Sequence, residues 1–136
     1  NGNWGFLVNT EMNEIKFSPI YDCGSCLNPM LEDCELSKLS DVELKNLAIN
    51  CYSCIKINGK KINYMSFLKQ MENTLLLENK DCNDAIRRVF ERIKIDNIYE
   101  LIENMEEISD IRKNFYKKII EIRYEILKEV YEKIVN

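Results

Sequence analysis

The sequence predicts a mainly α-helical protein with a β-hairpin at its N-terminus. Two patterns indicate this: residues 4–17 place β-prone runs on either side of a polar turn, and from Leu36 onward apolar residues recur every three or four positions. With 136 residues, 46% of them apolar and 31% charged, the chain is long enough to bury a core. We therefore expect one domain, 1–136, in which residues 1–27 form the hairpin and a metal-binding loop and residues 28–136 form a helical subdomain.

The hairpin is predicted from the β-prone residues 4–8 and from residues 15–17, where apolar and polar side chains alternate. The polar residues 9–13 between them supply turn chemistry, and Pro19 ends the second strand. Residues 20–35 contain Gly, Pro and several small side chains, and are expected to form a loop with one short helical turn.

Helices are predicted along the rest of the chain. Ser40 can cap the first one, and the Asn58-Gly59 turn signal is expected to lie beyond its end, with Cys51 and Cys54 at helical spacing near that end. Later helix starts are indicated at Asn63 or Ser66, at Asp81 or Asn83, and at Asp96. The side chains expected to face inward from the last two of these helices are Ala85, Ile86, Val89, Phe90, Ile93, Ile98, Leu101, Ile102 and Met105.

The last helix has the clearest pattern. Ser109 and Asp110 can cap it, and the spacing of its apolar residues predicts a single continuous helix over 110–135. That stripe consists of Ile111, Phe115, Ile119, Ile122, Ile126, Val130 and Ile134.

Composition excludes several classes of function. The net charge of -4 argues against direct nucleic-acid binding, which needs a basic face, and the absence of His excludes His-based catalysis and His-ligated metals. No apolar run approaches the roughly 18 residues of a membrane span. Six cysteines without a secretory signal favour free thiols and a cytoplasmic location.

Two motifs flank the predicted hairpin. Residues 3–7 read Asn-Trp-Gly-Phe-Leu, and residues 18–25 read Ser-Pro-Ile-Tyr-Asp-Cys-Gly-Ser. A hairpin between them would bring Asn3 and Asp22 together, and an amide and a carboxylate oxygen are the hard ligands that Mg²⁺ prefers. Gly24 would let the backbone turn sharply after Asp22.

This order of motifs, followed by an all-helical tail, resembles the C-terminal lobe of HipA-like serine/threonine kinases. Members show an Asp-x-His-x-x-Asn loop running into a strand, then a Pro-x-Tyr-Asp turn, then helices. The resemblance implies a protein-kinase-like C-lobe fragment in which Asn3 and Asp22 hold Mg²⁺ on the phosphates of ATP. Residues 112–124 also look like the closing helix of the family, although this match is less specific.

The resemblance also implies what these residues lack. The general base would be an Asp five residues before Asn3, upstream of residue 1, and the lobe with the phosphate-cradling loop and the nucleotide-binding Lys would precede it. We therefore expect a fragment of a kinase that phosphorylates Ser or Thr hydroxyls of a protein, without a catalytic residue of its own. Such a fragment would be inactive alone, would not bind ATP and Mg²⁺ tightly, and could have an antitoxin-like partner.

Two other interpretations stay open. Cys23, Cys26, Cys51 and Cys54 form two Cys-x-x-Cys pairs, the pattern of a structural zinc site, although the 24 residues between the pairs exceed the usual gap. Alternatively, the chain is a non-catalytic helical interaction module, for instance a partner-binding domain of the toxin–antitoxin type.

Overall fold

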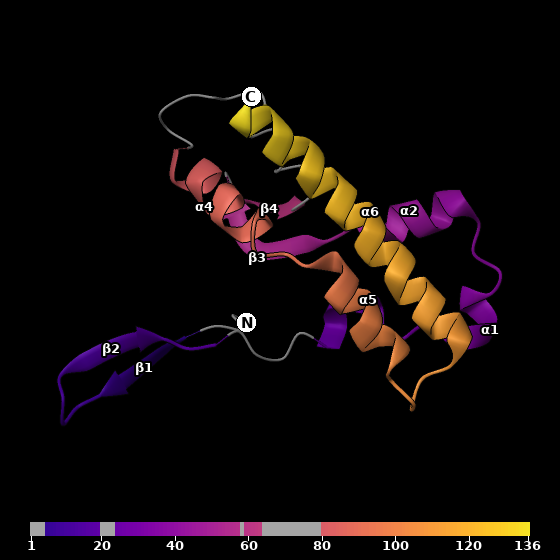
Figure 1. Ribbon diagram of the computed structural model, residues 1–136, viewed down its shortest axis with the longest axis horizontal. Helices are drawn as coiled ribbons and strands as arrows, with labels where there is room; N and C mark the ends of the chain where they lie inside the picture. The colour runs from indigo at the N-terminus through magenta and orange to yellow at the C-terminus, as the bar shows by residue number, and fades with distance from the viewer. Residues whose placement is uncertain (1–4, 20–23, 58, 64–79) are drawn as a thin grey trace. The chain divides into compact units, whose positions relative to one another are not determined.

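The computed structural model describes residues 5–19, 24–57, 59–63 and 80–136. The chain divides into two compact units, the hairpin unit (Asn1–Met30) and the helical unit (Leu31–Asn136), and each is described by itself. The predicted fold class is confirmed, since a β-hairpin precedes a mainly helical region (Figure 1). The prediction of one domain stays a prediction.

The hairpin unit contains strands β1 (Phe6–Asn9) and β2 (Glu14–Phe17), which pair in antiparallel register. The carboxamide oxygen of Asn9 accepts hydrogen bonds from two backbone N–H groups of the turn, at 3.0 and 3.2 Å. Asn13 completes the turn with a φ of 52°, in the left-handed region that Asn tolerates better than most residues. A 3₁₀ helix, η1 (Gly24–Leu27), is the short helical turn predicted in the following loop.

The helical unit combines helices with a second hairpin. Its described elements are α1 (Asp33–Leu36), α2 (Asp41–Ile49), β3 (Tyr52–Ile57), β4 (Lys60–Asn63), α4 (Lys80–Phe90), α5 (Ile95–Glu103) and α6 (Asp110–Val135).

Helix α2 begins where its capping sequence predicts. The Ser40 hydroxyl accepts a hydrogen bond from the Glu43 N–H at 3.3 Å, and the Glu43 carboxylate accepts one from the Ser40 N–H at 2.9 Å. This reciprocal capping box satisfies two N–H groups that a helix start otherwise leaves unpaired. At the other end, the Asn63 side chain donates to the Ile49 carbonyl at 2.8 Å and so ties the end of β4 to the end of α2.

The second hairpin corrects the prediction for the segment around Cys51 and Cys54. Helix α2 ends at Ile49, so Cys51 lies beyond the helix and Cys54 lies in strand β3, not at helical spacing. Ile57 pairs with Lys60, and Gly59 between them has a φ of 76°. The Asn-Gly signal therefore marks a tight hairpin turn, where Gly adopts the left-handed region without steric cost.

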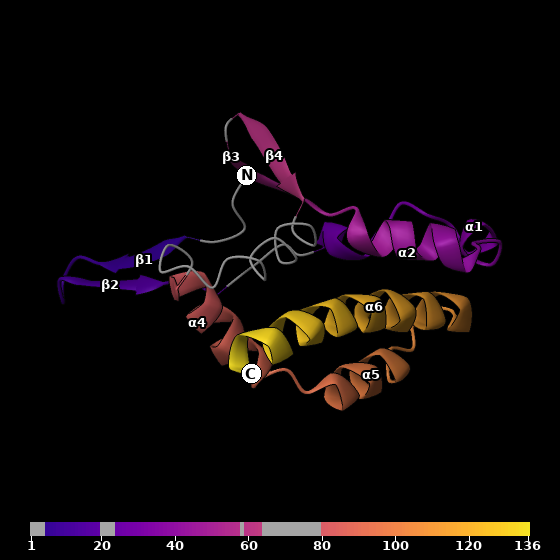
Figure 2. The ribbon, with the colours of Figure 1, turned by 90° about the horizontal axis from the view of Figure 1, so that it is seen from above.

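The core of the helical unit is built on α6, which packs against α1, α2, α4 and α5 (Figures 1 and 2). Ser109 caps α6 as predicted, accepting a hydrogen bond from the Arg112 N–H at 3.1 Å. Ile122 of the predicted stripe is half-buried, and the buried residues of α6 all belong to that stripe: Phe115, Ile119, Ile126, Val130 and Ile134. Other helices contribute Leu36, Leu44, Ala48, Ile86 and Ile102.

Four residues that the pattern placed inside are exposed, and the prediction for them is wrong. Val89 is 53% exposed, Leu101 63%, Met105 39% and Ile111 43%. Val89 and Leu101 lie within two residues of the ends of α4 and α5, Ile111 is the second residue of α6, and Met105 lies beyond the end of α5. Periodicity identifies the buried face of a helix but not how far along it the neighbour extends.

Candidate functional site

The predicted metal ligands, Asn3 and Asp22, flank the first hairpin in the sequence. Beyond the β1–β2 ladder, the Ser18 N–H donates to the Gly5 carbonyl at 2.8 Å, so the described pairing of the two chain segments continues to this point. Asn3 precedes Gly5 by two residues and Asp22 follows Ser18 by four, and both lie outside the described residues. Their role as Mg²⁺ ligands therefore stays a prediction, which the pairing of their flanking segments supports.

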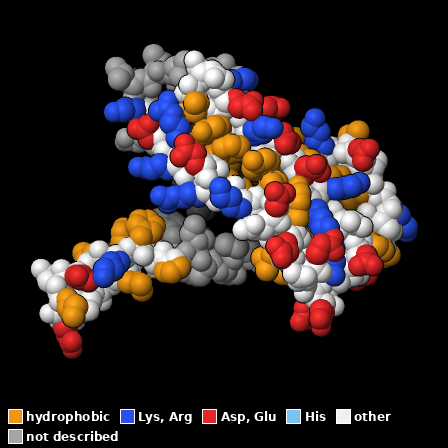
Figure 3. All heavy atoms as spheres, in the orientation of Figure 1, with side chains coloured by type: hydrophobic (Ala, Val, Ile, Leu, Met, Phe, Trp, Pro, Cys, Tyr) orange, Lys and Arg blue, Asp and Glu red, His pale blue; other side chains and the backbone are white. Residues whose placement is uncertain are grey.

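One face of this hairpin is apolar and exposed (Figure 3). Phe6, Val8, Ile15 and Phe17 alternate onto it with exposed fractions between 59% and 69%. The Phe6 and Phe17 rings meet edge to face, with centroids 5.0 Å apart. On the opposite face, Lys16 forms an exposed ion pair with Glu14 at 2.8 Å. Because a two-stranded hairpin is marginally stable by itself, this amphipathic ribbon is suited to packing against a further surface.

In the helical unit, a charged cluster joins α1 to the start of α6. The Arg112 guanidinium lies 2.9–3.0 Å from the Asp33 carboxylate and donates to the Leu31 carbonyl. A hydrogen bond from the Ser109 hydroxyl, together with Arg112, holds the pKa of Asp33 below its usual range. A hydrogen bond to the Tyr116 hydroxyl and the pair with Asp33 raise the pKa of Arg112. This cluster holds two segments together, because its charges satisfy one another.

A second feature of the helical unit is a row of aromatic rings. The Phe90 ring stacks on Tyr131 with centroids 4.4 Å apart and on Tyr124 with centroids 5.3 Å apart. The apolar pattern predicted Phe90 on the inward face of its helix and gave no role to the two tyrosines. The sequence feature that could have identified this row is the seven-residue spacing of Tyr124 and Tyr131, because that spacing returns a side chain to nearly the same face of a helix.

The structure describes the side chains of only two of the four cysteines in the alternative zinc site. Cys26 is exposed in the hairpin unit, whereas Cys51 is half-buried in the helical unit. The side chains of Cys23 and Cys54 lie outside the described part of the chain. Within that part, no three Cys, Asp or Glu side chains are grouped to hold a metal. Zinc binding therefore stays a prediction.

Comparison with known proteins finds a serine/threonine kinase of similar sequence and a kinase crystal structure of similar fold. The serine/threonine-protein kinase CtkA of Helicobacter pylori strain J99 is 40% identical over 127 residues, which are 90% of this chain and 37% of that protein. This chain is similar to part of a serine/threonine kinase. A crystal structure of the H. pylori proinflammatory kinase CtkA matches 99% of the chain with a TM-score of 0.82 and 36% identity. No protein-family model matches.

The similarity covers only part of these relatives. The chain spans 37% of the length of the curated kinase and 45% of the crystallised chain. The kinase relationship that the motifs predicted is thus supported at the level of CtkA, while the HipA-like assignment stays a prediction. Among the described helices, none combines the length and apolar character needed to cross a membrane.

Proposed function

We propose that this chain forms the C-terminal lobe of an ATP- and Mg²⁺-dependent, HipA-like kinase that phosphorylates Ser or Thr hydroxyls of a protein. The observation that carries the proposal is its similarity to CtkA, at 40% identity over 90% of the chain and with a matching fold. The chain corresponds to less than half of CtkA, so phosphotransfer is proposed for a longer protein that contains these residues, and not for the 136 residues alone.

In this proposal Asn3 and Asp22 hold the metal. Asp22 provides a charged oxygen, and Asn3 provides a neutral one that limits the negative charge beside the phosphates. The pairing of Gly5 with Ser18 supports the proposal, because it draws together the two segments that lead to these residues. Bound Mg²⁺ would neutralise charge that develops on the phosphate oxygens during transfer.

The other requirements of phosphotransfer would be met by parts of the kinase outside this chain. The general base and the groups that cradle the phosphates would come from outside these residues, as the family resemblance implies. The protein substrate, and any antitoxin-like partner, would be recognised by the longer protein.

A chimera tests this proposal. These 136 residues would replace the matching region of H. pylori CtkA, and intact-mass spectrometry would measure phosphate incorporated into the chimera and into casein with ATP and Mg²⁺. We expect transfer by the chimera and a loss of more than about 100-fold in Asp22→Asn, because even outer-shell partners of metal ligands contribute about 10- to 100-fold. Asp41→Asn makes the same chemical change at an exposed position of α2 and should leave the rate unchanged.

Two outcomes would contradict the proposal. A chimera that unfolds cooperatively on heating, and is therefore folded, but transfers no phosphate would exclude a kinase lobe. An active chimera whose Asp22→Asn variant keeps its rate would exclude Asp22 as a metal ligand.

A further inference from the structure

Helices α4 and α5 follow one another along the same side of α6 (Figure 1). Their exposed faces, here called the α4–α5 surface, carry opposite charge. Residues 87–94, at the end of α4 and just after it, contain four basic side chains and one acidic side chain, whereas residues 95–111 contain six acidic side chains and no Lys or Arg. Figure 3 shows this division, with blue side chains along the edge formed by α4 and red ones around α5 and the turn into α6.

The basic half of the α4–α5 surface surrounds an exposed apolar side chain. Val89 is 53% exposed, and Arg88 and Arg92 beside it are exposed too. At about 100° of rotation per residue, Arg92 projects between Arg88 and Val89, so the three side chains share one face. Neither arginine has an ion-pair partner within the described residues. Their like charges, four residues apart, repel each other along the helix, so local stability does not explain them.

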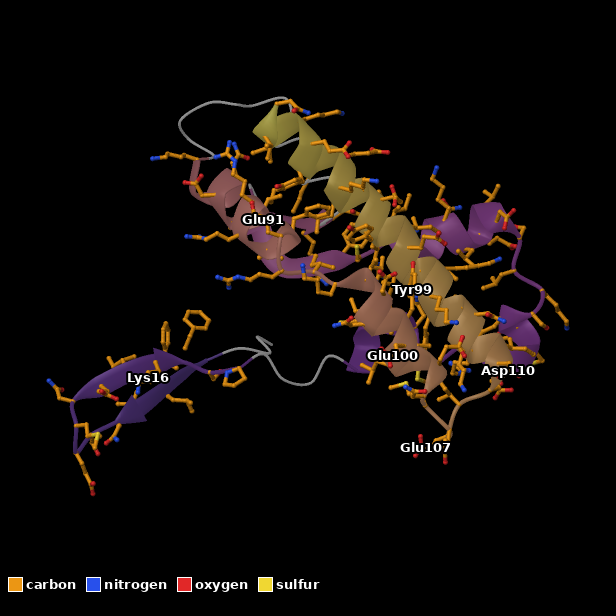
Figure 4. The ribbon with its side chains drawn as sticks, in the orientation of Figure 1. Lys16, Glu91, Tyr99, Glu100, Glu107 and Asp110 are labelled. Atoms are coloured by element: carbon orange, nitrogen blue, oxygen red, sulfur yellow. The ribbon has the colours of Figure 1, made fainter. Side chains whose placement is uncertain are left out.

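The other charges beside this half are already engaged within the helical unit. Arg87 lies 3.0 Å from the Asp84 carboxylate and donates to the Ile134 carbonyl at 2.7 Å. The Glu91 carboxylate accepts a hydrogen bond from the Tyr131 hydroxyl at 3.3 Å, and Figure 4 shows Glu91 on the side towards α6. The two exposed arginines are therefore the charges of this half that remain for a partner.

The acidic half repeats this arrangement with the opposite sign. Leu101 of α5 is 63% exposed, and the neighbouring Glu100 is exposed with it. Glu107 and Asp110 follow in the turn and at the start of α6, where Figure 4 shows both. None of these three acidic side chains has an ion-pair partner in the part of the chain that the structure describes.

The two halves do not neutralise each other within one chain. Among the described residues, no ion pair joins residues 87–94 to residues 95–111. A second copy related by a two-fold axis presents its acidic half to the basic half of the first copy, and its basic half to the acidic half of the first. Both contacts then form together, and the exposed Val89 and Leu101 add apolar area to them.

We propose that the α4–α5 surface binds a second copy of this chain in a two-fold symmetric dimer. The residues that form the contact are Arg88, Val89, Arg92, Glu100, Leu101 and Glu107. Charge complementarity selects this partner, because each half meets its opposite on the other copy. A nucleic acid would instead be repelled by the acidic half. The inference goes beyond phosphotransfer, and its residues all lie in the helical unit, so it stands or fails independently of the candidate metal site.

Sedimentation equilibrium of the 136-residue chain measures this association. We expect monomers and dimers in exchange at concentrations up to about 0.5 mM, a range that covers micromolar dissociation constants. Raising the salt concentration from about 0.1 M to about 1 M shortens the screening length from about 10 Å to about 3 Å. The dimer should then dissociate, because the charges that hold it together are exposed.

Two double variants give the whole surface a single sign. Arg88→Glu with Arg92→Glu makes both halves acidic, and Glu100→Lys with Glu107→Lys reverses two charges of the acidic half. Each double variant should weaken self-association by more than about 10-fold, because like charges then meet at both contacts of the dimer. An equimolar mixture of the two variants should associate again, since acidic halves then face basic ones.

Lys60→Glu with Lys61→Glu is the matched control, because it reverses two exposed charges of β4, outside this surface. It should change the dissociation constant by less than about 2-fold, the scale of isolated exposed charges. Circular dichroism checks that each variant is folded. A chain that stays monomeric in low salt, a double variant that still dimerises, or a mixture of folded variants that stays monomeric would each overturn the proposal. Assembly beyond the dimer would overturn it too, because a two-fold contact closes after two copies.

Discussion

The sharpest prediction concerns Ile119, at the centre of the buried face of α6. Its side chain is 0% exposed, and Ile119→Ala removes three buried carbons. At roughly 0.8 kcal/mol for each, the transfer contribution is about 2.5 kcal/mol. The cavity left in a core that cannot fully collapse raises the expected loss in the free energy of unfolding to about 3–4 kcal/mol.

Ile111→Ala is the matched control, because it makes the same change on the same helix at a side chain that is 43% exposed. We expect it to cost less than about 1 kcal/mol. Urea unfolding followed by circular dichroism at 222 nm would measure both variants, with the slope against urea unchanged. If Ile119→Ala were no more destabilising than Ile111→Ala, the assignment of the core to this face of α6 would be wrong.

Three smaller predictions concern local structure. Ser40→Ala should cost about 1 kcal/mol in a thermal melt by removing the cap of α2, and an unchanged melting temperature would contradict this role. Gly59→Ala should cost about 1–2 kcal/mol, since φ is 76° and no atom crowds the position; a neutral result would exclude the left-handed turn. Hydrogen bonds from Ser109 and Arg112 lower the pKa of Asp33 in the folded protein. Ionised Asp33 therefore stabilises the fold fully above the pKa that it has in the unfolded chain. This stabilisation is lost as the pH falls through the lower pKa of the folded state. The difference in melting temperature between the protein and Asp33→Asn should therefore shrink between pH 5 and pH 2.5, and a constant difference would refute this.

Sequence patterns could predict only the backbone elements that lead to the candidate metal site. The strands, the turn at Asn9 and the pairing up to Gly5 and Ser18 follow from alternation and turn chemistry within a few residues. That Asn3 and Asp22 hold a metal came from resemblance to a family, and no described contact decides it. The aromatic row of Phe90, Tyr124 and Tyr131 shows the opposite case. The seven-residue spacing of the tyrosines places them on one face of α6, but it does not indicate that Phe90 of α4 packs against them.

The sequence by itself determined the features that depend on near neighbours. These include the first hairpin, the capping box at Ser40, the cap at Ser109 and the buried stripe of α6, all of which arise within one or two turns of chain. The tertiary structure decided which residues of that stripe and of the other helices stay exposed, such as Leu101. It also joined Asp33 to Arg112, 79 residues apart, and brought Phe90 between Tyr124 and Tyr131. The physical reason is that a cap or an apolar period is encoded in consecutive residues. A contact across the fold instead depends on where whole elements pack, which no short stretch of sequence specifies.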